Sequence, residues 1–527
     1  MKKTFTRTLT MVLALLLIVT CLTGCNGGGA STGDFDETAG FTVQVGKPTG
    51  VSDEMWNSYL KELETRTDVP ITWDIASAAD AGAEALNLRF ASGDYPDLIL
   101  GNSLNASAVS DYAASGILLP LDEFINEEDT PNIWKMFEEN PTTKGANYLP
   151  DGHMYSLPQL IEFEPQYLER VLYINKAWLD KLGLEVPTTV DEVKEVLRAF
   201  KTQDPNGNGK ADEIPMSFMQ GHAFSCPETM LSTWGYSTKS GTYDSYTTVK
   251  DGKVLFAPMT DGWKEMIAFY RDLYKDGLLD MEAFTHTAEN FTAKLSNPTS
   301  TVGMAWAKNN PFQNADEYIA IEPIRVEGIE PVWHIHPGII GNRNVFSITN
   351  ACKNPKAVMK WVDHFYSLEN SLRLEFGEFG YAINDKNEEG VYTFNEAPEG
   401  ISLSTYIQEN KPIGSTVCYL PEEIFGTTLE LNKSQLEQQD NYEIYKKYVT
   451  TEPWPRPYYS DEESSTLSVL QTDIFTKVNE QMAKWVVGTE DLEKGWDKYV
   501  EDLKAMGVDQ LVEINQEAYD RFQKGMK

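Results

Sequence analysis

A ten-residue segment rich in oxygen-bearing side chains carries the strongest chemical signal in the sequence. Residues 204–213 read DPNGNGKADE, and a glycine stands at the sixth position. Side chains with oxygen occur at positions 1, 3, 5 and 9, namely Asp204, Asn206, Asn208 and Asp212. This spacing is that of the first part of an EF-hand loop, in which calcium takes about six to eight oxygens and the glycine permits a sharp turn.

The segment also departs from the EF-hand pattern at two positions. Position 7 is Lys210, which offers only its backbone carbonyl, and position 12 is Pro215 instead of glutamate. A bidentate acid would therefore have to come from Glu213. From the residues alone, a calcium site and an ordinary Asn/Gly-rich turn both remain open. Calcium there would be structural, because the loop joins a helix to a probable strand at 214–218.

Aromatic residues form the second group that could do chemistry, with 12 Trp, 25 Tyr and 23 Phe in the chain. Sugar sites stack aromatic faces on the C–H faces of pyranose rings, and polar groups orient the hydroxyls. Trp485 and Trp496 fall on apolar helical stripes and are predicted to be core residues. Trp234, Trp306 and Trp333 lie beside turn-like or strand-end sequence, so these three are the candidate ligand residues.

Catalytic motifs are absent or weak in the sequence. There is no Cys-x-x-Cys, His-Glu-x-x-His or Gly-x-Ser-x-Gly motif, and Ser58–Lys61 matches Ser-x-x-Lys without its Lys-Thr-Gly partner. Gly209-Lys210 is not a phosphate loop, because Ala211 stands where Ser or Thr is needed. The missing motifs predict that the chain is not an enzyme. A glycan-degrading enzyme stays open, since glycosidase carboxylates leave no local signature.

The N-terminal segment predicts export and a lipid anchor. Residues 1–24 combine a basic start with an apolar run at 11–23, which is typical of a signal peptide. They lead into Leu-Thr-Gly-Cys25, which resembles the lipobox of bacterial lipoproteins, in which the cysteine is acylated by groups such as palmitate. Residues 25–40 read as the lipidated cysteine and a flexible tether. We expect a chain held to the extracellular face of the cell membrane by lipid only; the alternative is a plain signal peptide.

The composition of the chain excludes some classes of partner and indicates its domain count and cysteine state. The net charge of the 527-residue chain is -36, which argues against nucleic acid and anionic membrane surfaces as partners. The length predicts two or more domains. Cys226, Cys352 and Cys418 form an odd, widely spaced set, which favours buried free cysteines over a disulfide framework.

The order of predicted elements indicates an α/β fold. Strands at 41–46, 71–75 and 97–100 alternate with helices at 53–65 and 81–91, which predicts a mostly parallel sheet. Ligands of such sheets bind at the carboxyl ends of the strands, and Asn102 follows the third strand. A capping box of Thr189 and Glu192 marks a helix at 187–200. Three further helices are predicted in the C-terminal part of the chain.

Several segments, in order over most of the chain, resemble a known family. They are ASGDYPDLI at 91–99, GILLPL at 116–121, DGHMYSLP at 151–158, LYINKAWLDKL at 172–182, the helix at 187–200, the loop at 204–215 and the KNP at 353–355. The chain resembles the family 1 extracellular solute-binding lipoproteins of carbohydrate ABC importers. It is most similar to the long branch that includes alginate-binding periplasmic proteins.

This resemblance implies an α/β two-lobe periplasmic-binding-protein-like fold (type II). Each lobe would be a mostly parallel sheet flanked by helices, with extra C-terminal helices. The first lobe would take 41–160 plus about 333–376, and the second about 161–332 plus 377–527. The chain would cross between lobes near 156–167, near 333 and around 376–381.

The resemblance also implies a function and site residues. The protein would be a monomer that captures an oligosaccharide and delivers it to an ABC permease; a ligand-presenting subunit of a membrane sensor is an alternative. Relatives hold a structural calcium ion in the matching loop, whose ligands here would be Asp204, Asn206, Asn208, Lys210, Asp212 and Glu213. TVGMAW at 301–306 is similar to the segment that places a stacking tryptophan in maltose-binding-type proteins, which makes Trp306 the foremost ligand residue. Asn102 and Tyr155 complete the candidates.

Overall fold

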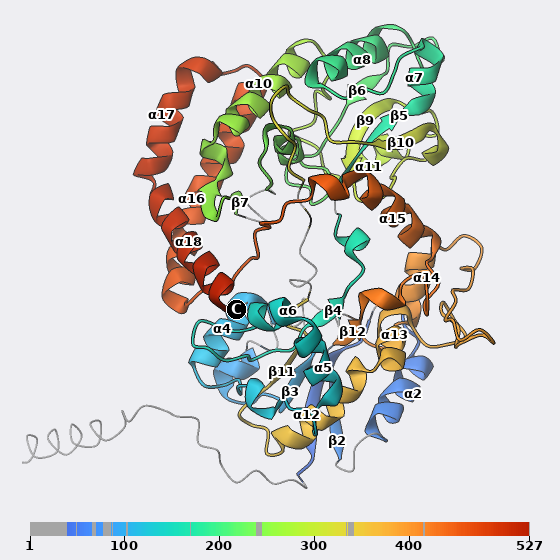
Figure 1. Ribbon diagram of the computed structural model, residues 1–527, viewed down its shortest axis with the longest axis vertical. Coiled ribbons are helices and arrows are strands. Elements are labelled where there is room, and N and C mark those ends of the chain that lie inside the picture. The colour runs from blue at the N-terminus through green and yellow to red at the C-terminus, as the bar shows by residue number, and fades with distance from the viewer. Residues whose placement is uncertain are drawn as a thin grey trace, which may run out of the picture.

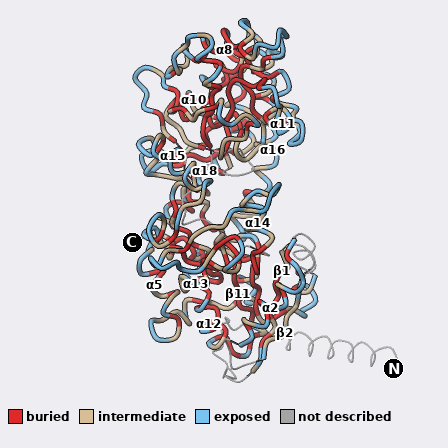
Figure 2. Tube along the Cα trace, turned by 90° about the vertical axis from the view of Figure 1, so that its right-hand side faces the viewer, coloured by how far each residue is buried: buried red, intermediate tan, exposed pale blue. Residues whose placement is uncertain are grey.

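The computed structural model describes residues 39–48, 50–65, 70–76, 86, 88–101, 104–168, 170–238, 245–333, 335, 342–414 and 417–525. The predicted signal segment, Cys25 and Asn102 lie outside the described residues. The chain forms two lobes, one above the other in the view of Figure 1, with several segments passing between them. Buried residues concentrate inside each lobe and thin out between the lobes (Figure 2).

The first lobe is built on a four-stranded sheet in the order β11-β3-β1-β2. β1 (Phe41–Gly46) pairs in parallel with β2 (Ile71–Ala76) and with β3 (Leu98–Leu100), whereas β11 (Phe346–Ile348) is antiparallel to β3. A second, two-stranded sheet pairs β4 (Gln159–Ile161) in parallel with β12 (Cys418–Leu420). Apolar side chains of β1 and β3 are fully buried, so both faces of the main sheet are covered, as parallel sheets require.

Helices flank these strands, and each begins where the sequence offers a cap. Ser52 accepts a hydrogen bond from Met55 N at the start of the first helix, and Asn105 accepts one from Ala108 N at the next. The helices of this lobe are α2 (Asp53–Glu64), α4 (Ala106–Ala114), α5 (Pro131–Glu139), α6 (Pro141–Ala146), α12 (Pro355–Asp363), α13 (Leu368–Phe376) and α14 (Leu403–Asn410).

The second lobe contains a four-stranded sheet in the order β10-β5-β9-β6 and a hairpin. Its strands are β5 (Val171–Asn175), β6 (Ile214–Met216), β9 (Val302–Ala307) and β10 (Tyr318–Ile321), and the hairpin joins β7 (Thr247–Lys250) to β8 (Lys253–Phe256). β6 is parallel to β9, but β5 is antiparallel to both β9 and β10. The expectation of a mostly parallel sheet therefore holds for the first lobe and fails for the second.

The helices of the second lobe include the capping box expected from sequence, in which Thr189 and Glu192 satisfy each other's backbone at the start of α8. These helices are α7 (Lys176–Leu182), α8 (Val190–Thr202), α10 (Asp261–Lys275), α11 (Ala288–Leu295), α15 (Lys433–Tyr445), α16 (Asp461–Val486), α17 (Leu492–Ala505) and α18 (Val508–Gly525). A long 3-10 segment, η3 (Pro227–Trp234), precedes the hairpin.

The lobe boundaries differ from those expected for residues 377–431. Residues 377–431, which the sequence assigns to the second lobe, pack with the first: Ile383, Cys418 and Leu429 share a buried cluster with Ile161 and Phe376. The cause is β12, a short apolar strand that completes a sheet with β4. The third crossing therefore lies at about 431–433, where α15 begins, instead of at 376–381. A further segment at about 450–460 leads back down to α16 (Figure 1).

The C-terminal helices connect the lobes along one side of the molecule (Figure 1). Val508 and Leu511, at the start of α18, belong to the core of the second lobe. The other end of the same helix, at Gly525, lies against Gly145 at the end of α6 in the first lobe. α18 is thus rooted in one lobe and docked on the other.

The described part of the chain also shows whether any helix could cross a membrane and whether the cysteines are paired. In the described part of the chain, no helix is both long and apolar enough to cross a membrane. Cys226, Cys352 and Cys418 are buried and free, as predicted.

Candidate functional site

The strand order determines which edge of the second sheet faces the first lobe. The chain leaves β4 of the first lobe and enters the second lobe at Val171, the first residue of β5. Val171 is paired with Ala307, the last residue of β9, because these two strands are antiparallel. β6 runs parallel to β9. The carboxyl ends of β6 and β9 therefore face the first lobe.

The strand order of the first sheet likewise determines which of its edges faces the second lobe. The chain returns from Trp333 and enters β11 at Phe346, which pairs with Leu100 at the end of β3. The backbone N–H of the next residue, Gly101, donates to Val345 O at 2.7 Å. The carboxyl ends of the parallel strands of both lobes therefore face one another across the gap, the position at which open α/β sheets bind ligands.

A pocket of about 260 Å³ lies at this edge of the second lobe. It is formed by the segments that follow β6 and β9 and by one face of α11. Its lining residues are His222, Phe224, Ser225, Phe291, Thr292, Leu295, Trp306, Ala307, Lys308, Asn309 and Pro311. Phe224 is half-buried and belongs to the aromatic part of the wall, and Asn309 supplies a polar group. Aromatic faces with a few polar groups are the composition of a sugar site.

Two titratable side chains, His222 and Lys308, line this pocket. Burial lowers the pKa of His222 and also that of Lys308, so both groups are shifted towards their neutral forms. The backbone N–H of Phe224 donates to His222 Nδ1 at 3.2 Å. In neutral His222 the proton is therefore on Nε2, which makes Nε2–H a hydrogen-bond donor.

A buried carboxylate behind the pocket fixes the position of its wall. Asp280 accepts hydrogen bonds from Ser217 Oγ at 2.8 Å, at the end of β6, and from Lys294 Nζ at 2.8 Å, on α11. His286 Nε2 lies 3.0 Å from the same carboxylate. Charge-assisted contacts of this kind are stronger than neutral ones. They hold α11, and with it Phe291, against the strand that ends at the pocket.

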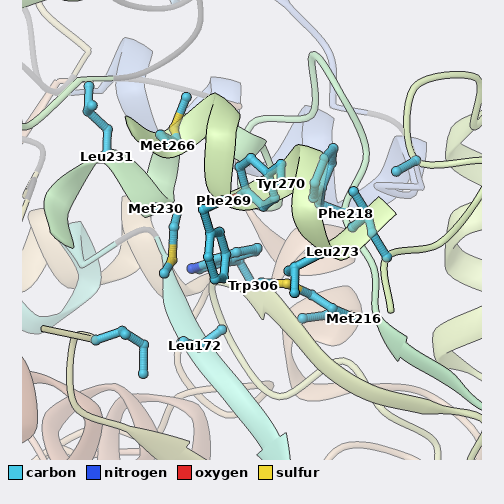
Figure 3. Close-up of a cluster of buried hydrophobic side chains, with 14 of the residues drawn as sticks. Leu172, Met216, Phe218, Met230, Leu231, Met266, Phe269, Tyr270, Leu273 and Trp306 are labelled. Atoms are coloured by element: carbon cyan, nitrogen blue, oxygen red, sulfur yellow. The ribbon is translucent and has the colours of Figure 1, made fainter. Parts of the chain in front are cut away.

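Trp306 borders the pocket but belongs mainly to the core. Its side chain is 1% exposed. In Figure 3 the ring lies among Met216, Phe269 and Leu273, in the largest buried cluster of the second lobe. A sugar ring could stack on this indole only after the wall of the pocket rearranged. The role of Trp306 as a stacking residue therefore stays a prediction.

The other aromatic candidates lie elsewhere. Trp234, at the end of η3, is 8% exposed and borders a different pocket of the second lobe. Trp333 is 3% exposed, and its Nε1–H donates to Arg170 O at 3.0 Å, which is a structural contact between two crossing segments. Tyr155 is in the first lobe, where its hydroxyl donates to Asp151 Oδ2 at 2.8 Å. These candidates do not converge on one site.

His222, Phe224, Phe291 and Lys308 were missed by sequence reasoning. The rule that selected Asn102, which takes residues directly after a strand, also applies to the segment after the strand expected at 214–218. It would have selected the residues around 219–225. Phe291 carries no such signal, because it reaches the pocket from a helix face.

The loop at 204–213 is a closed turn built from its own side chains. Asp204 has a positive φ of 45°, and its Oδ2 accepts from Gly209 N at 3.1 Å. Asn206 Nδ2 donates to Asp212 Oδ1 at 3.0 Å, and Asn208 Nδ2 donates to the same oxygen at 3.1 Å. Gly207 has a φ of 73°, as the sharp turn requires. The two amide groups thus place partial positive charge beside the Asp212 carboxylate, where a cation would otherwise do so.

Two oxygens of this loop are buried and have no hydrogen-bond partner among the described residues: Asp204 Oδ1 and Glu213 Oε1. Burial, followed by repulsion from Asp212 and Asp204, raises the pKa of Glu213. Unsatisfied carboxylate oxygens beside other carboxylates fit a hard cation with oxygen ligands. In the described part of the chain, no cluster of three or more His, Cys, Asp or Glu side chains could hold a metal ion. The fit here depends on Asn oxygens and the Lys210 carbonyl as well.

Comparison with known proteins identifies relatives along the whole chain. A model of the bacterial extracellular solute-binding protein family matches residues 49–371. The chain is 28% identical over 547 residues to the fructooligosaccharide ABC transporter substrate-binding protein FusA of Streptococcus pneumoniae, covering 99% of both. A solved FusA EF-hand mutant in complex with fructo-nystose has a TM-score of 0.74 and 26% identity, over 92% of this chain and 99% of that one.

Two further solved structures share the fold. An HMO-binding ABC-transporter-associated solute-binding protein of Bifidobacterium longum infantis gives a TM-score of 0.78 at 26% identity, covering 92% of this chain and 99% of that one. The alginate-binding protein AlgQ2, solved without calcium ion, gives 0.65 at 23% identity, covering 93% and 99%, and shows the fold alone. The two-lobe fold expected from the sequence is thereby confirmed.

Proposed function

This chain belongs to the bacterial extracellular solute-binding proteins, and we propose that it captures an oligosaccharide between its lobes and delivers it to the permease of an ABC importer. The observation that carries the proposal is the aromatic pocket at the carboxyl ends of β6 and β9, on the edge that faces the first lobe. End-to-end similarity to a fructooligosaccharide-binding relative supports the ligand class.

Capture would follow from closure of the lobes over the ligand. Phe224 would offer a face to a pyranose or furanose ring, and His222 Nε2–H and Asn309 would meet hydroxyl groups. The lobes are joined by crossing segments, so a hinge motion about these segments would bring the first-lobe edge onto the bound sugar. The closed form would dock on the permease.

Calorimetric titration of the purified protein with a panel of neutral oligosaccharides, including kestose, tests this proposal. We expect one class of oligosaccharide to bind with a Kd of about 1 μM, and chromatography to recover it intact. Phe224→Ala should weaken this binding by roughly 30- to 1000-fold. Failure of every oligosaccharide to bind would refute the proposal, and cleavage of the ligand would instead identify a glycan-degrading enzyme.

We also propose that the loop at 204–213 holds a structural calcium ion through Asp204, Asn206, Asn208, the Lys210 carbonyl, Asp212 and Glu213. The partnerless Asp204 Oδ1 and Glu213 Oε1 support it, as does the solved FusA EF-hand mutant. When bound, the ion would neutralise the loop carboxylates. The residues themselves connect the end of α8 to the start of β6, so an ordered loop stabilises the second lobe.

Finally, we propose that the monomeric chain is tethered to the outer face of the membrane by acylation of Cys25. The lipobox-like Leu-Thr-Gly-Cys supports this assignment. Cys25→Ser should release the protein into the medium or block its processing, which fractionation of cells will show. A mutant that stays with the membrane after salt washing would contradict the lipid anchor.

A further inference from the structure

A second pocket in the second lobe shares no lining residue with the pocket at the carboxyl ends of β6 and β9, which is named the inter-lobe pocket because that edge faces the first lobe. Its volume is about 1050 Å³, and it lies between η3, the start of α10, the turn at 328–332 and the crossing segment at 447–452. Trp234, Tyr236 and Tyr448 contribute aromatic side chains to its wall. A concave pocket of this size with aromatic walls is typical of a small-molecule site.

The pocket adjoins a much smaller polar chamber. Tyr236 and Ser237 belong to the walls of both spaces. The chamber has a volume of about 10 Å³, which is enough for one water molecule or one hydroxyl group. Glu228, from η3, lines it and is 1% exposed.

Four buried oxygens of the chamber have no hydrogen-bond partner among the described residues. They are both carboxylate oxygens of Glu228, the Oγ of Ser232 and the Oγ of Ser237. A buried polar group without a partner costs about 1–3 kcal/mol, so such groups are rare in folded proteins. Here four of them belong to residues that line one space. The chamber therefore has room for one further group that both donates and accepts hydrogen bonds.

The charges around the chamber indicate what kind of donor fits. The Glu228 carboxylate disfavours an anion, and the larger pocket has more acidic than basic residues in its wall, including Asp251, Asp261 and Glu265. The guanidinium of Arg170, which is 2% exposed, lines the same chamber and disfavours a cation. Arg170 Nη1 is directed to Thr238 O at 3.3 Å. A neutral group that donates hydrogen bonds is what remains.

We propose that this pocket is a second ligand site that takes a neutral polyhydroxylated molecule, a monosaccharide or a polyol, with one hydroxyl in the chamber beside Glu228. The hydroxyl donates to the carboxylate and accepts from a serine. The rest of the molecule lies in the larger pocket against Tyr236. The site does not depend on the proposed oligosaccharide function, because the two pockets have separate walls.

Saturation-transfer NMR with the full protein and four probes, namely fructose, glucose, galactose and myo-inositol, tests the proposal. We expect at least one probe to bind with a Kd of about 1 mM. Glu228→Gln keeps the shape of the side chain but removes one acceptor, and Tyr236→Ala removes the adjoining wall. Each change should weaken binding about tenfold or more. Phe224→Ala, in the inter-lobe pocket, is the matched control and should leave binding of the probe unchanged.

Two results would overturn this assignment. One is that none of the four probes binds the unmodified protein. The other is that a probe binds but is lost in Phe224→Ala and kept in Glu228→Gln and Tyr236→Ala, because the monosaccharide would then occupy the inter-lobe pocket. Melting curves of the variants accompany the titrations, so that loss of binding is scored only in folded protein.

Discussion

The loop at 204–213, the proposed calcium site, and the inter-lobe pocket, the proposed sugar site, are assembled in opposite ways. The loop takes all its candidate ligands from ten consecutive residues. The pocket draws on three separate segments, around 222, 291 and 306, and requires a sheet and a helix to bring them together. A contiguous site can be changed without removing side chains from the core, whereas an assembled site shares residues with the core. The two should therefore respond differently to substitution.

The largest effect is expected at Trp306, where the assembled site meets the core. Because the indole is 1% exposed, Trp306→Ala should lower the free energy of unfolding by about 3–5 kcal/mol through the cavity it leaves. Urea denaturation measures this. If the variant instead keeps its stability and loses sugar binding, Trp306 is a ligand residue, as the sequence predicts.

Substitution of Phe224 should lower ligand affinity and leave stability nearly unchanged, the opposite of the effect expected at Trp306. It lines the pocket but is only half-buried, so Phe224→Ala should lower oligosaccharide affinity by about 2–4 kcal/mol, or roughly 30- to 1000-fold, with little change in melting temperature. Phe394→Ala changes a half-buried aromatic residue of the first lobe and is the control. Equal affinity in both variants would remove the pocket from the binding site.

The stability of the loop at 204–213, the contiguous site, should depend on calcium. At a calcium concentration of about 100 times Kd, the ion should add about 2.7 kcal/mol to stability, so a chelator should lower the melting temperature. Asp204→Ala should remove that response. Lys210→Ala should keep it, since only the backbone carbonyl of this residue is a candidate ligand. Scanning calorimetry with and without chelator measures the melting temperature of the unmodified protein and of both variants. If calcium does not change the melting temperature of the unmodified protein, the loop is an ordinary turn.

The smallest effect is expected at Glu228. Burial raises the pKa of this carboxyl above its ordinary value of 4.5, so the folded protein holds the proton more tightly than the unfolded chain. Stability is then highest below pH 4.5 and is lost as the pH rises towards the folded-state pKa. Glu228→Gln removes this loss, so the substitution should be more favourable to stability at pH 7 than at pH 4. A pH-independent difference in melting temperature would contradict this.

Sequence reasoning succeeded where the signal is local. The first strand-helix-strand unit of the first lobe and the Thr189 capping box both depend on residues close together in the chain. It failed where pairing is distant. β12 is a three-residue strand more than 250 residues from its partner β4, and nothing nearby marks it. The reversed direction of β5 relative to β9 is likewise decided by tertiary packing.

The position of α18 has a practical consequence. The helix begins in the core of the second lobe, and its last residue, Gly525, rests on α6 of the first. Any rotation of one lobe against the other must slide or bend this contact. A fluorescent dye attached near Gly525 would therefore change its surroundings whenever the lobes move, which would turn the protein into an optical sensor for its own ligand without any label in the binding pocket.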